Sequence, residues 1–295
     1  MAKKRKQGWS IVVKDLKKEM PIHIYCAKAF SILGSKTAVK KAIEKRQLQL
    51  NGKPAQLNQQ IKNGDQLTLL PATRKKTKKV NVDLPILFED DHLIIVHKPA
   101  GIAVNGNRNT TVENALADKN KNNPLPDALP QPVAAHRIDL PTIGIVLLAK
   151  TKSALIHLGK AFQNNKIKKE YVAIVHGKPP LKGKINHLIQ GKKAETEFEV
   201  VETVPSKIFK HLSLVKLFPI TGRTHQLRIH MQKEDYLIVG DKMYAERQKT
   251  ILGKGLLLCA RGITFKHPKT QKNINLQIDI PPKFLKILKR EKERF

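Results

Sequence analysis

The chain of 295 residues is poor in cysteine, in acidic side chains and in long apolar runs. Its two cysteines, Cys26 and Cys259, form no CxxC pair and show no zinc-ligand spacing, which argues against a secreted disulfide scaffold and favours a reduced, cytoplasmic chain. No apolar run reaches the roughly 18 residues that a membrane-spanning helix needs, and no secretory leader follows the opening Lys3–Lys6. We therefore expect a soluble protein.

The shortage of acidic side chains leaves a large positive charge. The 56 Lys and Arg residues outnumber the 24 Asp and Glu residues, and the formal net charge is +32. Residues 1–80 carry 20 basic and 4 acidic side chains, and residues 81–295 carry 36 and 20, so the charge is densest near the N-terminus. Compact folding with so much self-repulsion indicates a polyanionic partner, RNA or DNA.

The length predicts one large domain or two unequal ones. Residues 1–20 are expected to form a basic extension, and a structured unit begins at residue 21. Ser35–Lys45 has a polar start and apolar residues at helical spacing, which predicts an amphipathic helix with a basic outer face. Residues 48–53 alternate and end in an Asn-Gly turn, and residues 64–70 give a second turn and strand.

This stretch, residues 21–71, resembles the small RNA-binding domain named after ribosomal protein S-four, through the phrases KAIEKRQLQLNGKPA and IKNGDQLTLL. The resemblance implies that the helix and the turn after it contact RNA through Lys36, Lys40, Lys41, Lys45 and Arg46. The alternative is a solvated basic helix that binds nothing. The basic block 74–79 predicts an exposed linker, placed at residues 72–84, that follows RNA phosphates.

Residues 85–295 are expected to form an α+β domain built on a sheet. Several short apolar segments bounded by Gly or Pro predict strands at 93–96, 145–149, 171–175, 197–201, 211–218, 256–259 and 274–278. Helical patterns cover residues 152–164, 224–232 and 282–294.

The signatures of nucleotide and metal sites are missing. No GxGxxG follows a strand, and Gly177–Lys184 departs from a phosphate-binding loop because its glycine spacing is one residue too long and Ile185 replaces the Ser or Thr. His225 and His230 lie five residues apart without a nearby Cys or an HExxH frame. We therefore expect no nucleotide cofactor and no metal.

The phrase HRIDLPTIG, from His136 to Gly144, places Asp139 in a turn-prone loop before an apolar strand. A carboxylate there needs partners or water, which is typical of a site. A structural Asp that caps its own loop is the alternative reading.

HRIDLPTIG resembles the HRLD-x-x-TSG motif of the RluA family of pseudouridine synthases. Three further family phrases follow the family's order: KPAG at 98–101, KEYVAIVHG at 169–177 and TGRTHQLRIH at 221–230. Gly240-Asp241 and Tyr244 fit the family's closing motif, so the resemblance covers residues 85–282. It implies a pseudouridine synthase fold, with a mixed, mainly antiparallel sheet and a catalytic cleft. One departure is Ile143, which stands where the family usually has Ser and leaves Asp139 in place.

Pseudouridine formation breaks the bond from uracil to ribose, rotates the base and rejoins it through carbon five. An ionised carboxylate suits this reaction, either as a nucleophile or as a base that opens a glycal route, and the residues leave both open. The resemblance implies that Asp139 is the catalyst and that Arg228 keeps it ionised. It also implies that Tyr171 stacks beneath the uracil, with its phenol near the proton of carbon five. A core aromatic is the alternative for Tyr171.

The remaining residues of the family motifs are expected to contact RNA: Arg137, which would fill the space of the flipped base, and His136, Lys98 and Arg223. For Arg137, a plain phosphate contact or a structural ion pair is the alternative. The leading hypothesis is therefore an isomerase that acts as a monomer on large-subunit ribosomal RNA, with transfer RNA as the next substrate. A non-catalytic RNA-binding or ribosome-assembly factor is the rival. A DNA-binding regulator is disfavoured because no helix-turn-helix or basic zipper pattern is present.

Overall fold

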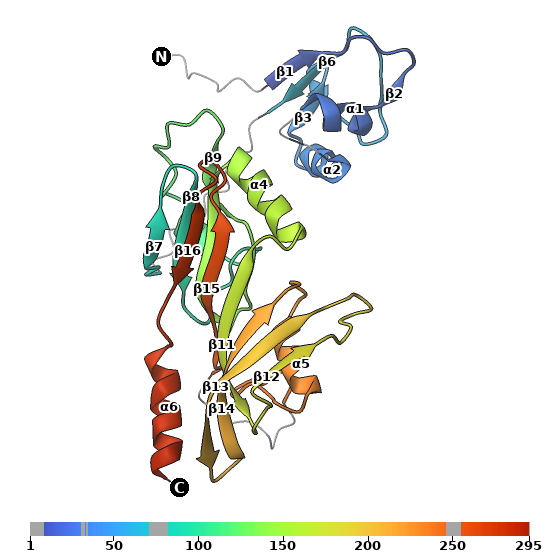
Figure 1. Ribbon diagram of the computed structural model, residues 1–295. Coiled ribbons are helices and arrows are strands. Elements are labelled where there is room, and N and C mark those ends of the chain that lie inside the picture. The colour runs from blue at the N-terminus through green and yellow to red at the C-terminus, as the bar shows by residue number, and fades with distance from the viewer. Residues whose placement is uncertain (1–8, 31–32, 34, 71–81, 246–254, 295) are drawn as a thin grey trace. The chain divides into compact units, whose positions relative to one another are not determined.

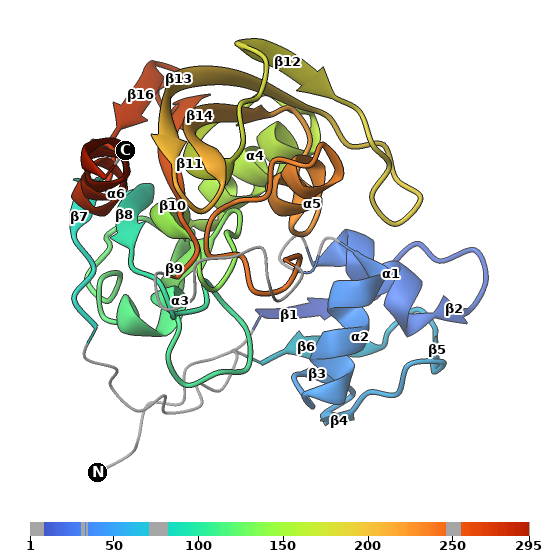
Figure 2. The ribbon, with the colours of Figure 1, turned by 90° about the horizontal axis from the view of Figure 1, so that it is seen from below.

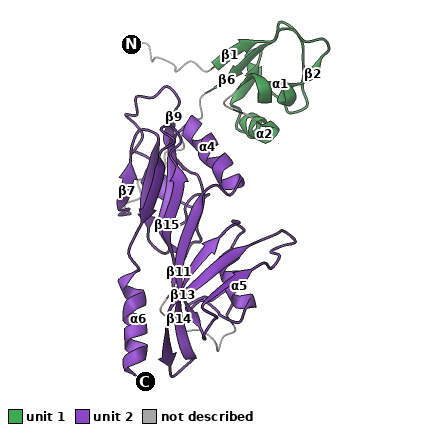
Figure 3. Ribbon diagram, viewed as in Figure 1, with its two compact units in different colours: residues 1–76 green, residues 77–295 purple. Residues whose placement is uncertain are grey.

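The computed structural model describes residues 9–30, 33, 35–70, 82–245 and 255–294, and divides the chain into two compact units, residues 1–76 and 77–295 (Figure 3). The basic block 74–79 lies outside the described residues. Within those residues, no helix combines the length and apolar character that crossing a membrane requires.

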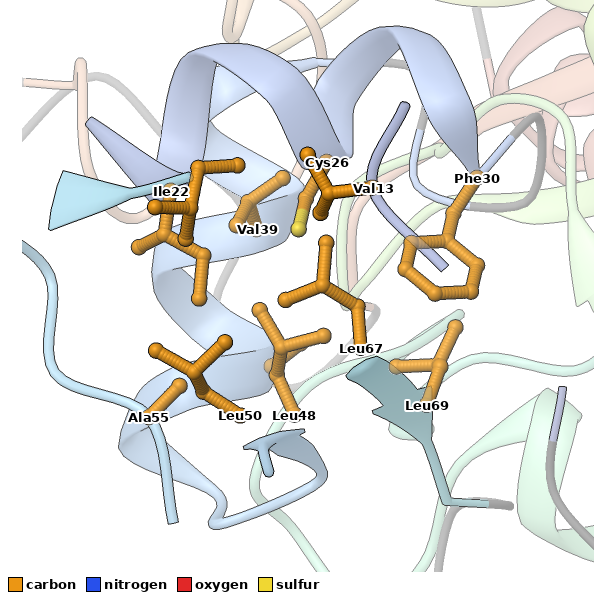
Figure 4. Close-up of a cluster of buried hydrophobic side chains, with 12 residues drawn as sticks. Val13, Ile22, Cys26, Phe30, Val39, Leu48, Leu50, Ala55, Leu67 and Leu69 are labelled. Atoms are coloured by element: carbon orange, nitrogen blue, oxygen red, sulfur yellow. The ribbon is translucent and has the colours of Figure 1, made fainter. Parts of the chain in front are cut away.

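Unit 1 is a small α+β domain. Its four-stranded sheet has the order β1 (Trp9–Val12), β6 (Gln66–Leu69), β3 (Leu48–Leu50) and β4 (Lys53–Pro54). A second pair joins β2 (Met20–Pro21) to β5 (Gln60–Ile61). Helices α1 (Ile22–Ala29) and α2 (Lys36–Glu44) contact each other, and their apolar residues Ile22, Cys26 and Val39 meet Leu48 and Leu67 in the core (Figure 4).

The N-terminal boundary expected at residue 21 is wrong. Strand β1 pairs with β6 in antiparallel register, and Val13 is fully buried in the core of unit 1. The hydrophobic content of Ile11–Val13 thus draws residues 9–20 into the unit. At the other end, Leu84 is buried in the core of unit 2, so the expected linker ends earlier than residue 84.

Helix α2 has the capped, amphipathic character that its sequence predicts. The Ser35 hydroxyl at its N-cap accepts a hydrogen bond from the Ala38 N–H at 3.2 Å, and Val39 and Ala42 are buried. All five basic residues proposed to contact RNA, from Lys36 to Arg46, are exposed. This leaves the outer face of α2 and the turn after it strongly positive.

Unit 2 is built on one large sheet, so the predicted α+β class with a mixed, mainly antiparallel sheet is confirmed. Among the described strands, its order is β12 (Lys182–Ile185), β13 (Thr196–Ser206), β14 (Lys210–Pro219), β11 (Lys168–His176), β15 (Leu258–Lys266), β10 (Ile143–Thr151), β8 (Leu93–Lys98) and β7 (Ile86–Glu89). In addition, β16 (Asn273–Gln277) pairs with β15, and β9 (Ala128–Ala134) pairs with β10.

The sheet has two halves that meet where β10 runs parallel to β15. The register there pairs Ile143 with Cys259 and Gly144 with Ala260, while the other strand pairs described are antiparallel. Gly144 has φ +114°, and a Cβ on it would lie 2.2 Å from the Ala260 carbonyl oxygen. Only glycine allows this approach. We call this joint the seam, strands β7 to β10 the β10 half, and strands β11 to β16 the β11 half.

Helices cover both faces of the β11 half (Figures 1 and 2). On β11, Val172 and Ile174 pack in the cluster that contains α6 (Pro282–Glu293), whereas Ala173 and Val175 pack in the cluster that contains α5 (Gln226–Lys233). The alternation of strand side chains therefore places α5 and α6 on opposite sides. Helix α4 (Lys152–Gln163) packs against β10, and the short α3 (Val112–Ala115) contacts β9.

Candidate active site

A cleft of about 480 Å³ opens in unit 2 where the two halves of the sheet meet. One wall is the loop 135–142, which leads into β10, together with the end of α4. The other wall is the start of β11, the turn at residues 221–225 and the first turns of α5. Segments far apart in the sequence thus line one concave space, which is the usual setting of an active site.

Asp139 lies in a tight turn on the first wall. The Thr142 N–H donates to the Asp139 carbonyl at 3.1 Å, which closes the Asp-Leu-Pro-Thr turn. Its carboxylate is 17% exposed and faces two groups on the other wall: Arg228 Nη1 at 3.4 Å from Oδ2, and His225 Nε2 at 3.8 Å from Oδ1. The Asp139 carboxylate therefore lines the cleft and at the same time lies beside the Arg228 cation.

Arg228 is held mainly by a second carboxylate. Its Nε and Nη2 donate to the Asp241 oxygens at 2.7 and 2.8 Å, and its guanidinium carbon lies 5.0 Å from the centre of the Tyr244 ring. Although burial opposes it, the hydrogen bonds and charge of Asp241, then the charge of Asp139, raise the pKa of Arg228. Arg228 is a fixed cation that presents one nitrogen to Asp139.

Tyr171 lines the cleft at the start of β11 and packs against apolar clusters on both sides of it. Burial raises the pKa of the Tyr171 phenol, and the charge of Asp139 raises it further. Every group that shifts this pKa raises it, so the phenol keeps its proton. A protonated phenol can donate a hydrogen bond, and its ring can offer a stacking surface.

The position of Lys98 does not fit the sequence-based expectation that it contacts RNA. Its side chain is fully buried, and its Nζ donates to the carbonyl oxygens of Pro99 (2.9 Å), Ile102 (2.9 Å) and Leu140 (3.2 Å). Burial lowers the pKa of Lys98 to about 8, against the opposing charge of Asp139. Lys98 therefore braces the turn that carries Asp139.

His136 also has a structural role. Its ring stacks on Phe162 at 4.9 Å, and its Nε2 accepts the Leu147 N–H at 3.1 Å. Burial lowers the pKa of His136 to about 4, so it offers no charge to a phosphate. All three residues line the cleft, but Arg137 and Arg223 differ from His136 in being exposed. Arg223 Nε donates to the Lys193 carbonyl at 3.0 Å.

Two cleft residues, Lys169 and His225, were not predicted as site residues from the sequence. Lys169 lines the cleft and donates to the Thr221 carbonyl at 3.2 Å, and burial lowers its pKa to about 8. His225 forms a 2.8 Å hydrogen bond through Nδ1 with the Tyr244 hydroxyl. Their positions carried a signal, because Lys169 lies two residues before Tyr171 on a strand and His225 lies three before Arg228 in a helical turn.

Ile143 replaces the usual Ser without facing the cleft. It is not among the residues that line the cleft, and it packs against the cluster that contains Val172, Cys259 and Phe284 beneath α6. The missing hydroxyl thus changes the apolar packing at the seam. It removes nothing from the surroundings of Asp139.

Comparison with known proteins identifies the class. The profile of the RNA pseudouridylate synthase family matches residues 92–233. The chain is 31% identical to the ribosomal large subunit pseudouridine synthase C of Vibrio parahaemolyticus, over 86% of this chain and 87% of that protein. It is 34% identical to the dual-specificity RNA pseudouridine synthase RluA of Escherichia coli, over 63% of this chain and 88% of that protein.

Solved structures agree. The structure of human RNA pseudouridylate synthase domain containing 4 matches this chain with a TM-score of 0.57 and 25% sequence identity, and the match covers 70% of this chain and 92% of that one. The chain is thus an RNA pseudouridine synthase, an isomerase. It belongs to the RluA family, as the four motifs predict.

Proposed function

We propose that this enzyme converts uridines of large-subunit ribosomal RNA to pseudouridine, with Asp139 as the catalytic carboxylate acting on a flipped-out base. The observation that carries this proposal is the position of Asp139, which lies 3.4 Å from the cation Arg228 and shares one cleft with the aromatic Tyr171. A carboxylate with a fixed cation beside it and a stacking surface near it suits attack on the ribose or the base. The name of the relative from Vibrio parahaemolyticus supports the choice of RNA.

The position of Arg137 supports the proposal that the target base is flipped out. It is exposed, lies two residues before Asp139 and lines the same cleft, so its planar cation can enter the duplex as the target uridine leaves. Arg223 on the opposite wall, with its exposed guanidinium, suits a phosphate near the target.

Unit 1 is proposed to hold the RNA through its basic helix, as in the domain named after ribosomal protein S-four. Lys36, Lys40, Lys41, Lys45 and Arg46 supply sequence-independent affinity for folded RNA. The proposal includes action as a monomer in the cytoplasm. Both cysteines are buried and unpaired, which suits a reducing compartment.

Tritium release from RNA labelled at carbon five of uracil tests the proposal. The substrates are total ribosomal RNA and total transfer RNA from cells without their own modification enzymes, and the variant is Asp139→Ala. Wild-type release from ribosomal RNA with none from the variant is expected. Release from transfer RNA alone would contradict the substrate, and equal release by the Asp139→Ala variant would contradict the catalyst.

A further inference from the structure

Pseudouridine formation leaves a proton to be removed. When carbon five joins the ribose, it carries both the sugar and its original hydrogen, and this hydrogen must depart to restore the aromatic ring. The bond from carbon five to hydrogen breaks, its electron pair forms the double bond between carbons five and six, and the ring electrons displaced there settle on nitrogen one, which takes a proton from water. A base in the cleft must accept the first proton.

Most of the cleft's titratable groups are unsuited to this step. Tyr171 keeps its proton because burial raises its pKa. Arg228 is permanently charged and bound to Asp241. Lys169, whose pKa burial lowers to about 8, is mostly protonated at neutral pH and donates to the Thr221 carbonyl. Asp139 faces the Arg228 cation at 3.4 Å and already serves the bond changes at the ribose in the proposed function.

His225 meets the requirements that remain. It lines the cleft with its side chain 23% exposed, and its Nε2 lies 3.8 Å from Asp139 Oδ1. Its Nδ1 is hydrogen-bonded to the Tyr244 hydroxyl at 2.8 Å, and the Tyr244 ring in turn lies against Arg228. When Nδ1 carries the proton and donates it to Tyr244, Nε2 keeps a lone pair on the cleft side.

The backbone at His225 adds a second observation. Its φ of +55° and ψ of +21° lie in the left-handed region, which non-glycine residues adopt at a cost, and it stands at the N-cap of α5 without a side-chain cap hydrogen bond. The imidazole does not cap the helix and contacts Asp139 and Tyr244 instead.

We propose that His225 accepts the proton of carbon five at Nε2 and that Tyr244 orients its ring for this step. The titratable groups in contact with His225 are Asp139 from the loop before β10 and Tyr244 from the segment after Asp241. Arg228 from α5 contacts both of these groups. The Asp139 carboxylate stabilises the imidazolium that forms, which then releases its proton to water. This inference rests on the proposed function and adds the proton acceptor to it.

The test uses the full-length enzyme and whichever RNA the wild type modifies, prepared with hydrogen or deuterium at carbon five of uracil. The variant His225→Asn keeps a small amide that tolerates left-handed backbone, Tyr244→Phe removes only the orienting hydroxyl, and His157→Gln on α4 is the matched control outside the cleft. Single-turnover rates are measured from pH 5 to pH 9.

We expect His225→Asn to lower the rate about 10²–10⁴-fold, as loss of a general base does, with a larger deuterium isotope effect than the wild type and little change in KM. Tyr244→Phe is expected to lower the rate less, with an isotope effect in the same direction, and His157→Gln to leave both unchanged. The dependence of the rate on pH should differ between the wild type and His225→Asn, because the variant lacks the proposed proton acceptor.

A rate loss in both variants without an increased isotope effect would overturn the inference and leave His225 a structural residue. A wild-type rate in His225→Asn would overturn it as well. These outcomes differ from failure of the proposed function, in which the wild type itself modifies no ribosomal RNA.

Discussion

A substitution in the buried ion pair of Arg228 and Asp241 tests how the site is held together. The Asp241 side chain is fully buried and that of Arg228 is 5% exposed, and two hydrogen bonds of 2.7 and 2.8 Å join them. Asp241 Oδ1 also accepts the N–H groups of Met243 and Tyr244. The substitution Asp241→Asn keeps the shape and one acceptor oxygen but removes the charge and places an N–H₂ group against the guanidinium.

The expected loss follows from the burial. Removal of one partner from a buried ion pair costs about 3–5 kcal/mol, because the remaining charge is left without compensation. That is a large part of the roughly 5–15 kcal/mol that stabilises a typical protein. The released guanidinium then turns toward Asp139, and a shift of about 1 Å in a catalytic group costs on the order of 10²-fold in rate.

Calorimetry and the tritium-release rate measure the two effects. Calorimetry is preferred to fluorescence because the single tryptophan, Trp9, lies in unit 1 and reports on the wrong part of the chain. The double variant Arg228→Met with Asp241→Asn is the control. It should recover most of the lost stability, since no unpaired charge remains, and should stay inactive. A single variant with the stability and rate of the wild type would refute the reasoning.

Three further predictions concern Gly144 at the seam, the buried Lys98 beneath the Asp139 turn, and Lys169 in the cleft. Gly144→Ala should cost about 3 kcal/mol or more in unfolding free energy, because its Cβ would meet the Ala260 carbonyl at 2.2 Å; near-normal stability in a calorimetric scan would contradict this. Lys98→Met should cost about 1–4 kcal/mol at pH 7, since three carbonyls lose a donor while a buried cation is also removed. Burial lowers the pKa of Lys98 to about 8, so above pH 8 the folded wild type loses a proton that the unfolded chain still holds, and its stability rises with pH. In denaturant titrations the difference in unfolding free energy between the wild type and Lys98→Met should therefore widen above pH 8. A difference that stays constant with pH would contradict the lowered pKa of Lys98. Lys169 lines the cleft, and we expect its cation to contact RNA. RNA affinity of the wild type should then weaken as the pH rises through about 8, where Lys169 loses its charge, and filter binding should show less of this weakening in Lys169→Met; identical pH curves would contradict a contact between Lys169 and RNA.

Much of the fold was predictable because its core elements bury continuous or periodic apolar patterns. Helix α6 buries Phe284, Ile287 and Leu288 at helical spacing, and β8 and β10 are almost entirely buried. The elements that escaped prediction lack such patterns. Strand β9 contains two prolines and pairs only with β10 among the described strands, and α1 begins after Pro21 without a side-chain cap.

Site residues that belong to sequence motifs could be predicted, whereas roles that depend on tertiary contacts could not. Asp139, Tyr171 and Arg228 lie in three separate motifs, and the fold brings them to one cleft. Lys98 was misassigned because a lysine is usually exposed, and the three carbonyls that surround it converge only in the folded chain. No local sequence pattern predicts that these carbonyls surround Lys98.

The seam gives the enzyme a site that neither half of its sheet contains. Asp139 belongs to the β10 half, and Tyr171 and Arg228 belong to the β11 half, joined through the register of Gly144 with Ala260. The 3.4 Å separation of Arg228 from Asp139 therefore measures how well the two halves are aligned. Substitutions in distant core residues that slide one half against the other will reduce turnover before they reduce stability, although they touch no residue of the cleft.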